Sequence, residues 1–232
     1  GPAEDFTNRE KIAGLLRFST TNDDSDKQSA SFDDYIGRMK PEQEAIYYIT
    51  ADSFLAAKNS PHLEIFKKKN IEVLLLGDRV DEWLISNLTE YKNKKFQSIA
   101  KGDLDLGKLE DESEKGEKKK IEEKAKTLIE KIKTSLGDKV KDVKVTHRLT
   151  DSPACLVVGE HDISGNLERI LKAAGQNTPG NKPILEINPE HKLIEKLRKF
   201  EGTSDFDEYT SVIFDQAMLS EGGQLDDPVD FV

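Results

Sequence analysis

The sequence predicts an α/β protein made of two successive units: a small, sandwich-like α/β unit, then a mixed α+β unit that ends in helices. Two runs of β-branched and aromatic residues, 45–49 and 71–76, are each followed by helix-forming segments. A charged, glycine-containing stretch at residues 101–116 then carries no aromatic residue, which is typical of a boundary between units. After it, apolar residues recur at helical spacing in residues 117–136 and again in 204–220.

The first unit is expected to cover residues 1–100. Ser60-Pro61 places an N-cap before a proline at the first helical position, and Gly77-Asp78 turns the chain from a strand into a helix. The expected elements are a helix 4–18, a loop 19–31, a short helix near 32–36, a strand 45–49, a short helix after Asp52 or Ser53, a helix 60–69, a strand 71–76 and a helix 79–88.

The second unit is expected to cover residues 117–232. Gly137 ends its first helix, and valines alternate with charged residues in 140–145, as in a half-exposed strand. Residues 154–158 are expected to pair with that strand across a turn at 150–153. The other expected elements are a helix 117–136, a helix 162–174, a loop 177–183, a strand 183–187, a helix 189–200 and a helix 204–220.

The composition argues against several classes of protein. Lys and Arg number 35 and Asp and Glu 45, a formal net charge of −10, which disfavours a nucleic-acid partner. No apolar run approaches the ~18–20 residues that a membrane span needs, so no membrane partner is expected. The single cysteine, Cys155, allows no internal disulfide and fits a reducing compartment, so a cytoplasmic location is expected.

Few residues form a pattern typical of catalysis. The sequence has neither a Gly-x-Gly-x-x-Gly motif nor a P-loop, and its four histidines lack metal-ligand spacing, so no catalytic residue and no metal site are predicted. Cys155 lies in an apolar strand and is expected to be an inert, buried thiol. The turn at Gly77-Asp78 leaves one alternative open, a small α/β enzyme that uses a nucleotide there.

Two predicted helices carry apolar stripes whose role periodicity leaves open. In the helix 79–88 the inward stripe is formed by Val80, Leu84 and Leu88. The margin of that stripe carries Glu82, Trp83 and Ser86. In the helix 162–174 the stripe is formed by Ile163, Leu167, Ile170, Leu171 and Ala174. The pattern alone does not distinguish a helix that faces the core from one that offers its stripe, or an aromatic anchor, to a partner.

The last predicted helix is apolar on two sides. One sector is formed by Phe206, Ile213, Phe214 and Ala217. A second sector is formed by Tyr209, Val212 and Leu219. A helix of this kind needs neighbours on both sides, and self-association through a helix bundle would supply them. The expected dimer interface therefore consists of Phe206, Tyr209, Val212, Ile213, Phe214 and Ala217.

Several blocks of the sequence together resemble the bacterial heat shock protein 90 family. They run in order along almost the whole chain, and most of them are long, so the resemblance is specific. The blocks are NREKIA at 8–13, LLRF at 15–18, YYITADS at 47–53, SPHLE at 60–64, EVLLL at 72–76, DRVDEW at 78–83, THRLTDSPA at 146–154, LEINPEH at 185–191, DQA at 215–217 and DP at 227–228.

The resemblance implies that the chain is part of an ATP-dependent molecular chaperone. Residues 1–100 would be the end of the middle domain, 101–116 a charged linker and 117–232 the C-terminal dimerisation domain. The family binds ATP and Mg in an N-terminal domain that no block of this chain matches. No cofactor and no ATPase activity are therefore expected in this chain.

The resemblance also implies partners. The family binds non-native client proteins, and the matching client-binding positions are Glu82, Trp83, Ser86, Ile163, Leu167, Ile170 and Leu171. Homodimerisation is implied too, although the sequence stops at Val232, just inside the helix that Asp227-Pro228 opens, which would weaken a dimer. The 70-kDa heat-shock chaperone DnaK is a further expected partner. A purely structural dimerisation module without a client surface is the remaining alternative.

Overall fold

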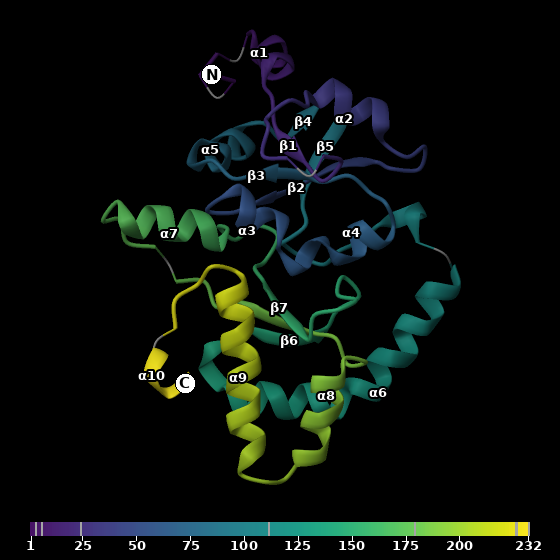
Figure 1. Cartoon of the computed structure of the whole chain (residues 1–232), viewed down its shortest axis with the longest axis vertical. Coiled ribbons are helices and arrows are strands. Elements are labelled where there is room, and N and C mark those ends of the chain that lie inside the picture. The colour runs from purple at the N-terminus through teal and green to yellow at the C-terminus, as the bar shows by residue number, and fades with distance from the viewer. Residues whose placement is uncertain are drawn as a thin grey trace.

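Two separate β-sheets, one in each half of the chain, lie one above the other along the long axis of the molecule (Figure 1). This computed structural model describes residues 1–231 except residues 3, 6, 24, 111, 179 and 226. Predictions that fall on those six positions or on Val232 concern residues outside the described ones. Within the described part, no helix has the length and apolar character needed to cross a bilayer.

The sheet of the first unit has five strands in the order β1-β3-β2-β5-β4. The strands are β1 (Ser19–Thr20), β2 (Ala45–Thr50), β3 (Leu74–Leu76), β4 (Glu90–Tyr91) and β5 (Lys94–Ser98). The central strand β2 runs parallel to both β3 and β5. The β4–β5 hairpin was not predicted, because β5 is mostly polar and both strands are short; its turn residues Lys92 and Asn93 have φ of 47° and 63°.

Helices cover both faces of this sheet. They are α1 (Arg9–Leu15), α2 (Phe32–Arg38), α3 (Phe54–Lys58), α4 (Glu64–Lys68) and α5 (Arg79–Asn87), with a 3₁₀ turn at Pro61–Leu63. The alternation of β2 explains the arrangement: Tyr47 and Ile49 belong to the core with α3 and α4, whereas Ile46 and Tyr48 belong to the core with α1, α2 and α5. A strand buried on both faces reads as a continuous apolar run, as predicted for 45–49.

Gly77 has a steric reason to be glycine. A Cβ at this position would lie 2.6 Å from the backbone nitrogen of Phe54, so the β3–α5 turn packs directly against the start of α3. The next residue, Asp78, accepts a hydrogen bond from the side-chain amide of Gln28, 2.7 Å away. The turn that suggested a nucleotide site therefore serves the packing of α3 on the sheet.

The expected linker, 101–116, is partly folded. Leu106 is buried in the core of the first unit, and Leu104 and Leu109 pack against it. The long helix of the second unit, α6, spans Glu112–Leu136 and so begins inside the expected linker. Its C-terminal half places Leu128, Ile132 and Leu136 in the core of the second unit.

The sheet of the second unit corrects the predicted strand pairing. Its strands are β6 (Asp142–Val145), β7 (Ala154–Val157) and β8 (Ile184–Ile187). The order is β6-β8-β7, so β8 lies between the two strands that were expected to pair with each other. β8 is parallel to β6 and antiparallel to β7. Burial does not reveal this order from the sequence, because the edge strand β7 is as fully buried as the central strand β8.

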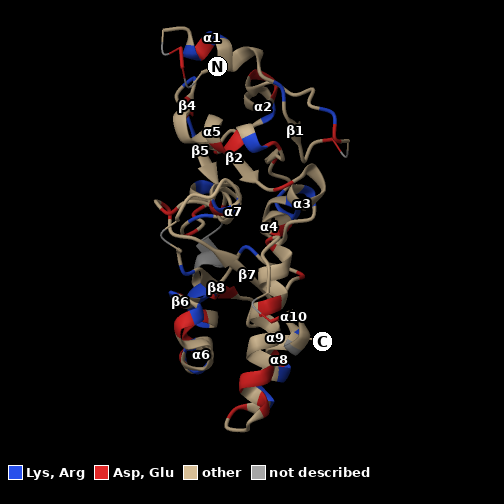
Figure 2. Cartoon of the chain, turned by 90° about the vertical axis from the view of Figure 1, so that its left-hand side faces the viewer, with Lys and Arg blue, Asp and Glu red and all other residues tan. Residues whose placement is uncertain are grey.

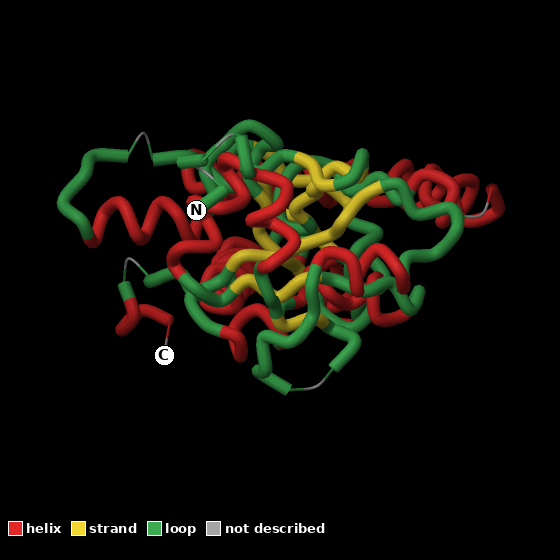
Figure 3. The backbone as a smooth tube through the Cα atoms, turned by 90° about the horizontal axis from the view of Figure 1, so that it is seen from above, coloured by secondary structure: helices red, strands yellow, loops and turns green. Residues whose placement is uncertain are grey.

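One face of this sheet is covered by α6 and by α9 (Asp205–Ser220), and α8 (Lys192–Leu197) packs on the same core. Seen from above, the strands of the two units overlap at the centre with helices around them, and α10 (Pro228–Phe231) lies at the periphery (Figure 3). The first turn of α9 carries Asp205, Asp207 and Glu208, which favours the helix through its dipole and makes this end of the molecule acidic (Figure 2).

The two apolar sides of α9 have different environments. Four of the six residues expected in a dimer interface are buried inside this chain: Phe206, Ile213, Phe214 and Ala217. These four residues pack on the sheet of their own unit, which corrects their assignment to an intermolecular surface. The second side remains outward, with Tyr209 exposed over 45% and Val212 over 44% of their surfaces. The sequence could not rank the two sides, because both are apolar.

Candidate functional site

A cavity of about 270 Å³ lies where the two units meet, between α5 of the first unit and the segment that leads into α7 (Gly165–Ala173) of the second. Its walls are formed by Tyr48, Thr50, Glu82, Ile85, Ser86, Lys101, His161, Asp162, Ile163 and Leu167. Four of the seven expected client-binding residues, Glu82, Ser86, Ile163 and Leu167, therefore line one cavity. The fold brings together two helices that are about 80 residues apart in the sequence.

The exposed side of α5 is more apolar than predicted. Trp83 is exposed over 66% of its surface, and so is Val80, which the helical wheel had placed in the inward stripe. Leu84 and Leu88 are buried as expected. Asp81 is buried instead of Val80, because its carboxylate accepts the N–H of Asp78 at 2.9 Å and closes the first turn. Burial raises the pKa of Asp81 to about 6.

The helix α7 does not belong to any hydrophobic core found among the described residues. Its stripe residues Ile163, Leu167, Ile170 and Leu171 are each only partly buried. Ser164 caps the helix by accepting the N–H of Leu167 at 3.0 Å. Of the two interpretations that the pattern left open, the structure therefore favours a helix that projects beside α5 over one packed into the core (Figure 1).

Glu82 was expected on an exposed client-binding surface, but it is buried between α5 and the start of α7. Only 6% of the residue is exposed. One carboxylate oxygen accepts hydrogen bonds from the hydroxyl of Ser164 at 2.7 Å and from the amide of Asn166 at 3.1 Å. Beside it, the ammonium of Lys101 donates to the carbonyl of Asp162 at 2.8 Å, and burial lowers the pKa of Lys101. These contacts tie the start of α7 to the first unit.

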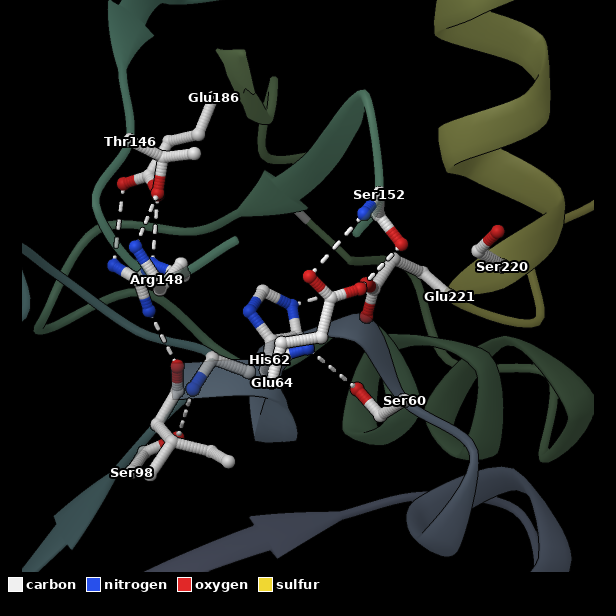
Figure 4. Close-up of polar contacts among 12 residues, drawn as sticks. Ser60, His62, Glu64, Ser98, Thr146, Arg148, Ser152, Glu186, Ser220 and Glu221 are labelled. Carbon is white, nitrogen blue, oxygen red and sulfur yellow. Dashed lines mark hydrogen bonds and ion pairs between the residues drawn. The ribbon is translucent and has the colours of Figure 1, made fainter. Parts of the chain in front are cut away.

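A second set of contacts joins the units next to the C-terminal end of α9. Arg169 of α7 donates to the carbonyl of Glu221 at 2.9 Å and pairs with Asp52 at 3.0 Å. The imidazole of His62, which is fully buried, lies 2.9 Å from the carboxylate of Glu221 (Figure 4). The position of α7 is thus fixed by Glu82 of α5, by Asp52 just before α3 and by Glu221 just after α9.

Glu64 connects α4 to the turn before β7 (Figure 4). One of its carboxylate oxygens accepts the backbone N–H groups of Thr150 at 2.5 Å, Asp151 at 2.7 Å and Ser152 at 3.2 Å. The other accepts the hydroxyl of Ser152 at 2.5 Å. Burial alone raises the pKa of Glu64, but these hydrogen bonds outweigh it and hold the pKa below its ordinary value.

A buried ion pair, Arg148 with Glu186, lies on the face of the second sheet that is turned toward the first unit (Figure 4). The guanidinium contacts the Glu186 carboxylate at 2.7 Å and 3.1 Å. Its remaining N–H groups donate to the carbonyls of Ile99 and of Gly102, the latter at 2.8 Å. Thr146 donates a further hydrogen bond to Glu186 at 2.6 Å. No pattern in the sequence indicated this pair, since an arginine after a strand is commonly solvated.

A larger cavity, about 430 Å³, lies between α6, β6 and the segment 103–110. The ionic groups on its walls pair with one another: Lys144 with Asp103 at 2.8 Å, Lys118 with Glu110 at 2.7 Å, and His147 with Glu122 at 3.1 Å. None of the site residues predicted from the sequence lines it. The described residues hold no group of three or more His, Cys, Asp or Glu side chains placed to bind a metal ion.

Comparisons with known proteins agree along the whole chain. The profile of the family described as "Hsp90 protein" matches residues 1–232. Over all 232 residues the chain is 63% identical to "Chaperone protein HtpG" of Dechloromonas aromatica, 60% to that of Nitrosomonas europaea and 57% to that of Burkholderia cenocepacia. In each case the whole of this chain is matched but only 36% of the relative, so the chain spans about a third of these proteins.

Proposed function

This chain belongs to the Hsp90 protein family, and from that premise we propose that it is the part of a molecular chaperone that binds segments of non-native proteins between α5 and α7. The observation that carries the proposal is that α5 and α7, which enclose one cavity, both carry apolar residues that are not fully buried. Ile85 of α5 and Ile163 and Leu167 before and in α7 line the cavity. Outside its lining, Trp83 and Val80 are exposed on α5, and Leu171 is partly buried on α7.

The physical basis is apolar area placed where an unfolded segment can bury against it. Such burial contributes about 25 cal/mol per Å² and has no directional requirement. Polar and charged groups next to the aliphatic residues, among them His161 and Asp162, surround the apolar area. A surface of this kind binds loosely and without demanding one sequence, which is what a chaperone for many clients requires.

We expect the double variant Trp83→Ala, Leu167→Asn to suppress the aggregation of a heat-denatured client poorly. The variant removes the exposed aromatic residue of α5 and one apolar residue of the α7 stripe, and anchors of this kind dominate binding energies. The amount of chain needed for half-maximal suppression, followed by light scattering, should rise about tenfold.

The matched control is Leu15→Asn on α1, which removes an exposed leucine (75% exposed) far from the cavity. This control should suppress aggregation like the unaltered chain. If the double variant keeps its far-UV circular dichroism spectrum and also its full suppression, the surface between α5 and α7 does not bind clients. The alternative of a purely structural module would then be favoured.

We propose further that the outward side of α9 mediates self-association. Tyr209 and Val212 are large and nearly half exposed, and Leu219 is exposed over 45% in line with them. Two copies that contacted one another through this side would bury it on both, as a symmetric helix pair does. A partnership with DnaK, which the family resemblance implies, stays a prediction.

Light scattering behind size exclusion tests the α9 surface. At rising concentration the mass should move from 26.1 kDa toward twice that value, and Val212→Lys should keep it at 26.1 kDa, because a lysine there must be desolvated in the contact. Thr89→Lys adds the same charge at an exposed position of the first unit and should not change the mass. A dimer that persists in Val212→Lys would place the interface elsewhere.

A further inference from the structure

Glu82 was expected to face a client, yet its carboxylate lies inside the contact between α5 and α7. The residue is 6% exposed, and its two partners, Ser164 and Asn166, are 8% and 7% exposed. Both partners donate to the same oxygen, at 2.7 Å and 3.1 Å. A carboxylate so enclosed has little surface left with which to contact a client.

The two partners are the residues on which the start of α7 depends. Ser164 is the N-cap of α7, and its hydroxyl oxygen accepts the N–H of Leu167 while its O–H donates to Glu82. Asn166 lies in the first turn and also contacts Arg169 at 3.4 Å through its side-chain oxygen. Hydrogen bonds to an ionised acceptor are stronger than neutral ones, so Glu82 holds this turn more firmly than a neutral acceptor could.

We propose that Glu82 is a positioning residue: its carboxylate holds the first turn of α7 against α5 and so sets the width of the cavity between them. The stripe of α7 gains no support from the cores of the described residues, so the helix depends on such polar anchors for its place. The consequence for clients rests on the function proposed above. The attachment of α7 to Glu82 does not rest on that function, and it is measured separately.

Two substitutions of Ser164 distinguish its hydrogen bond to Glu82 from its role as the N-cap of α7. Asp and Asn are both good N-caps and nearly equal in size. Asn can still donate a hydrogen bond to Glu82, whereas Asp places a second carboxylate against it. Ser164→Asp should therefore release α7, and Ser164→Asn should keep it in place. Glu82→Ala is the direct test, with Glu82→Gln, which retains an acceptor oxygen, as its conservative partner.

The first measurement is amide hydrogen exchange of peptides from residues 165–173 in the full chain. We expect Glu82→Ala and Ser164→Asp to raise the exchange rate at least about tenfold, while Ser164→Asn stays within about twofold. Glu90→Ala, which removes an exposed glutamate of the same unit, should leave exchange in α7 unchanged. Unchanged exchange in both Glu82→Ala and Ser164→Asp would show that Glu82 does not hold α7 in place.

The second measurement is binding to reduced, carboxymethylated lactalbumin as a permanently unfolded probe. The two releasing variants should weaken binding several-fold, and Ser164→Asn and Glu82→Gln should restore most of it. Raised exchange with unaltered binding in the releasing variants would refute the positioning role. If instead Trp83→Ala, Leu167→Asn also binds the probe normally, it is the proposed function that fails, and the exchange comparison still decides the anchor.

Discussion

Arg148→Met is expected to lower the free energy of unfolding by about 3–5 kcal/mol, the largest effect that we predict. The substitution leaves the buried carboxylate of Glu186 without its counter-charge, and it leaves the carbonyls of Ile99 and Gly102 without donors. A buried charge that loses its partner retains its desolvation cost without the attraction that offset it. Denaturation by urea, followed by circular dichroism, measures the loss.

A second substitution distinguishes the charge from the packing of the arginine. In Arg148→Met with Glu186→Gln no ionised group remains, and Gln can still accept the hydrogen bond from Thr146. We expect this double variant to be more stable than Arg148→Met alone, which gives a positive coupling energy in the mutant cycle. A loss below about 1 kcal/mol in Arg148→Met would mean that water reaches the pair and that it does not hold the units together.

Glu64→Gln is expected to lower the free energy of unfolding by about 2–3 kcal/mol. The carboxylate accepts four hydrogen bonds from the turn at residues 150–152, and a neutral amide oxygen cannot replace them all. Glu64 is on α4 and the turn belongs to the second unit, so the contact between the units should loosen first. Faster amide exchange in the peptide that contains residues 149–153 would report it.

The effect of Glu64→Gln should depend on pH in a known direction. Because the folded-state pKa of Glu64 is below its ordinary value, the carboxylate stabilises the fold above the unfolded pKa, near 4.5, and this contribution is lost as the pH falls through the folded pKa. The stability difference between the unaltered chain and Glu64→Gln should thus be full at pH 7 and shrink below about pH 4. Glu44→Gln, at an exposed position, is the control. A stability difference that stays constant down to pH 3 would show that the ionised carboxylate of Glu64 is not its cause.

Local sequence signals predicted those elements that local physics decides. The run at 45–49 is apolar on both of its faces, and it forms most of the central strand β2 (Ala45–Thr50). The apolar spacing in 162–174 and 204–220 predicted helices there, and the structure has α7 at Gly165–Ala173 and α9 at Asp205–Ser220. The helix predicted at 4–18 is shorter in the structure, Arg9–Leu15, and Leu15 at its end is exposed. Only Ala13 of that helix is buried.

Contacts between distant segments could not be predicted in this way. The place of β8 between β6 and β7 depends on residues about 40 positions away, and a pattern within one strand does not record it. The same holds for Glu82, whose burial follows from Ser164 and Asn166 in the other unit. Trp83 was placed correctly at the margin of α5, but Val80 was not, because the helix buries the capping carboxylate of Asp81 in its stead.

The central position of β8 also constrains how the second unit is made on the ribosome. When β6 and β7 have been synthesised, neither has a neighbouring strand, since both pair only with β8. Roughly 40 residues separate the end of β6 from the start of β8, which takes about 2–8 s at ordinary rates of translation. Throughout that time the apolar side of α6 has no sheet to cover. The nascent second unit is therefore itself an unfolded chain with exposed apolar surface, the same kind of segment that the finished protein is proposed to bind.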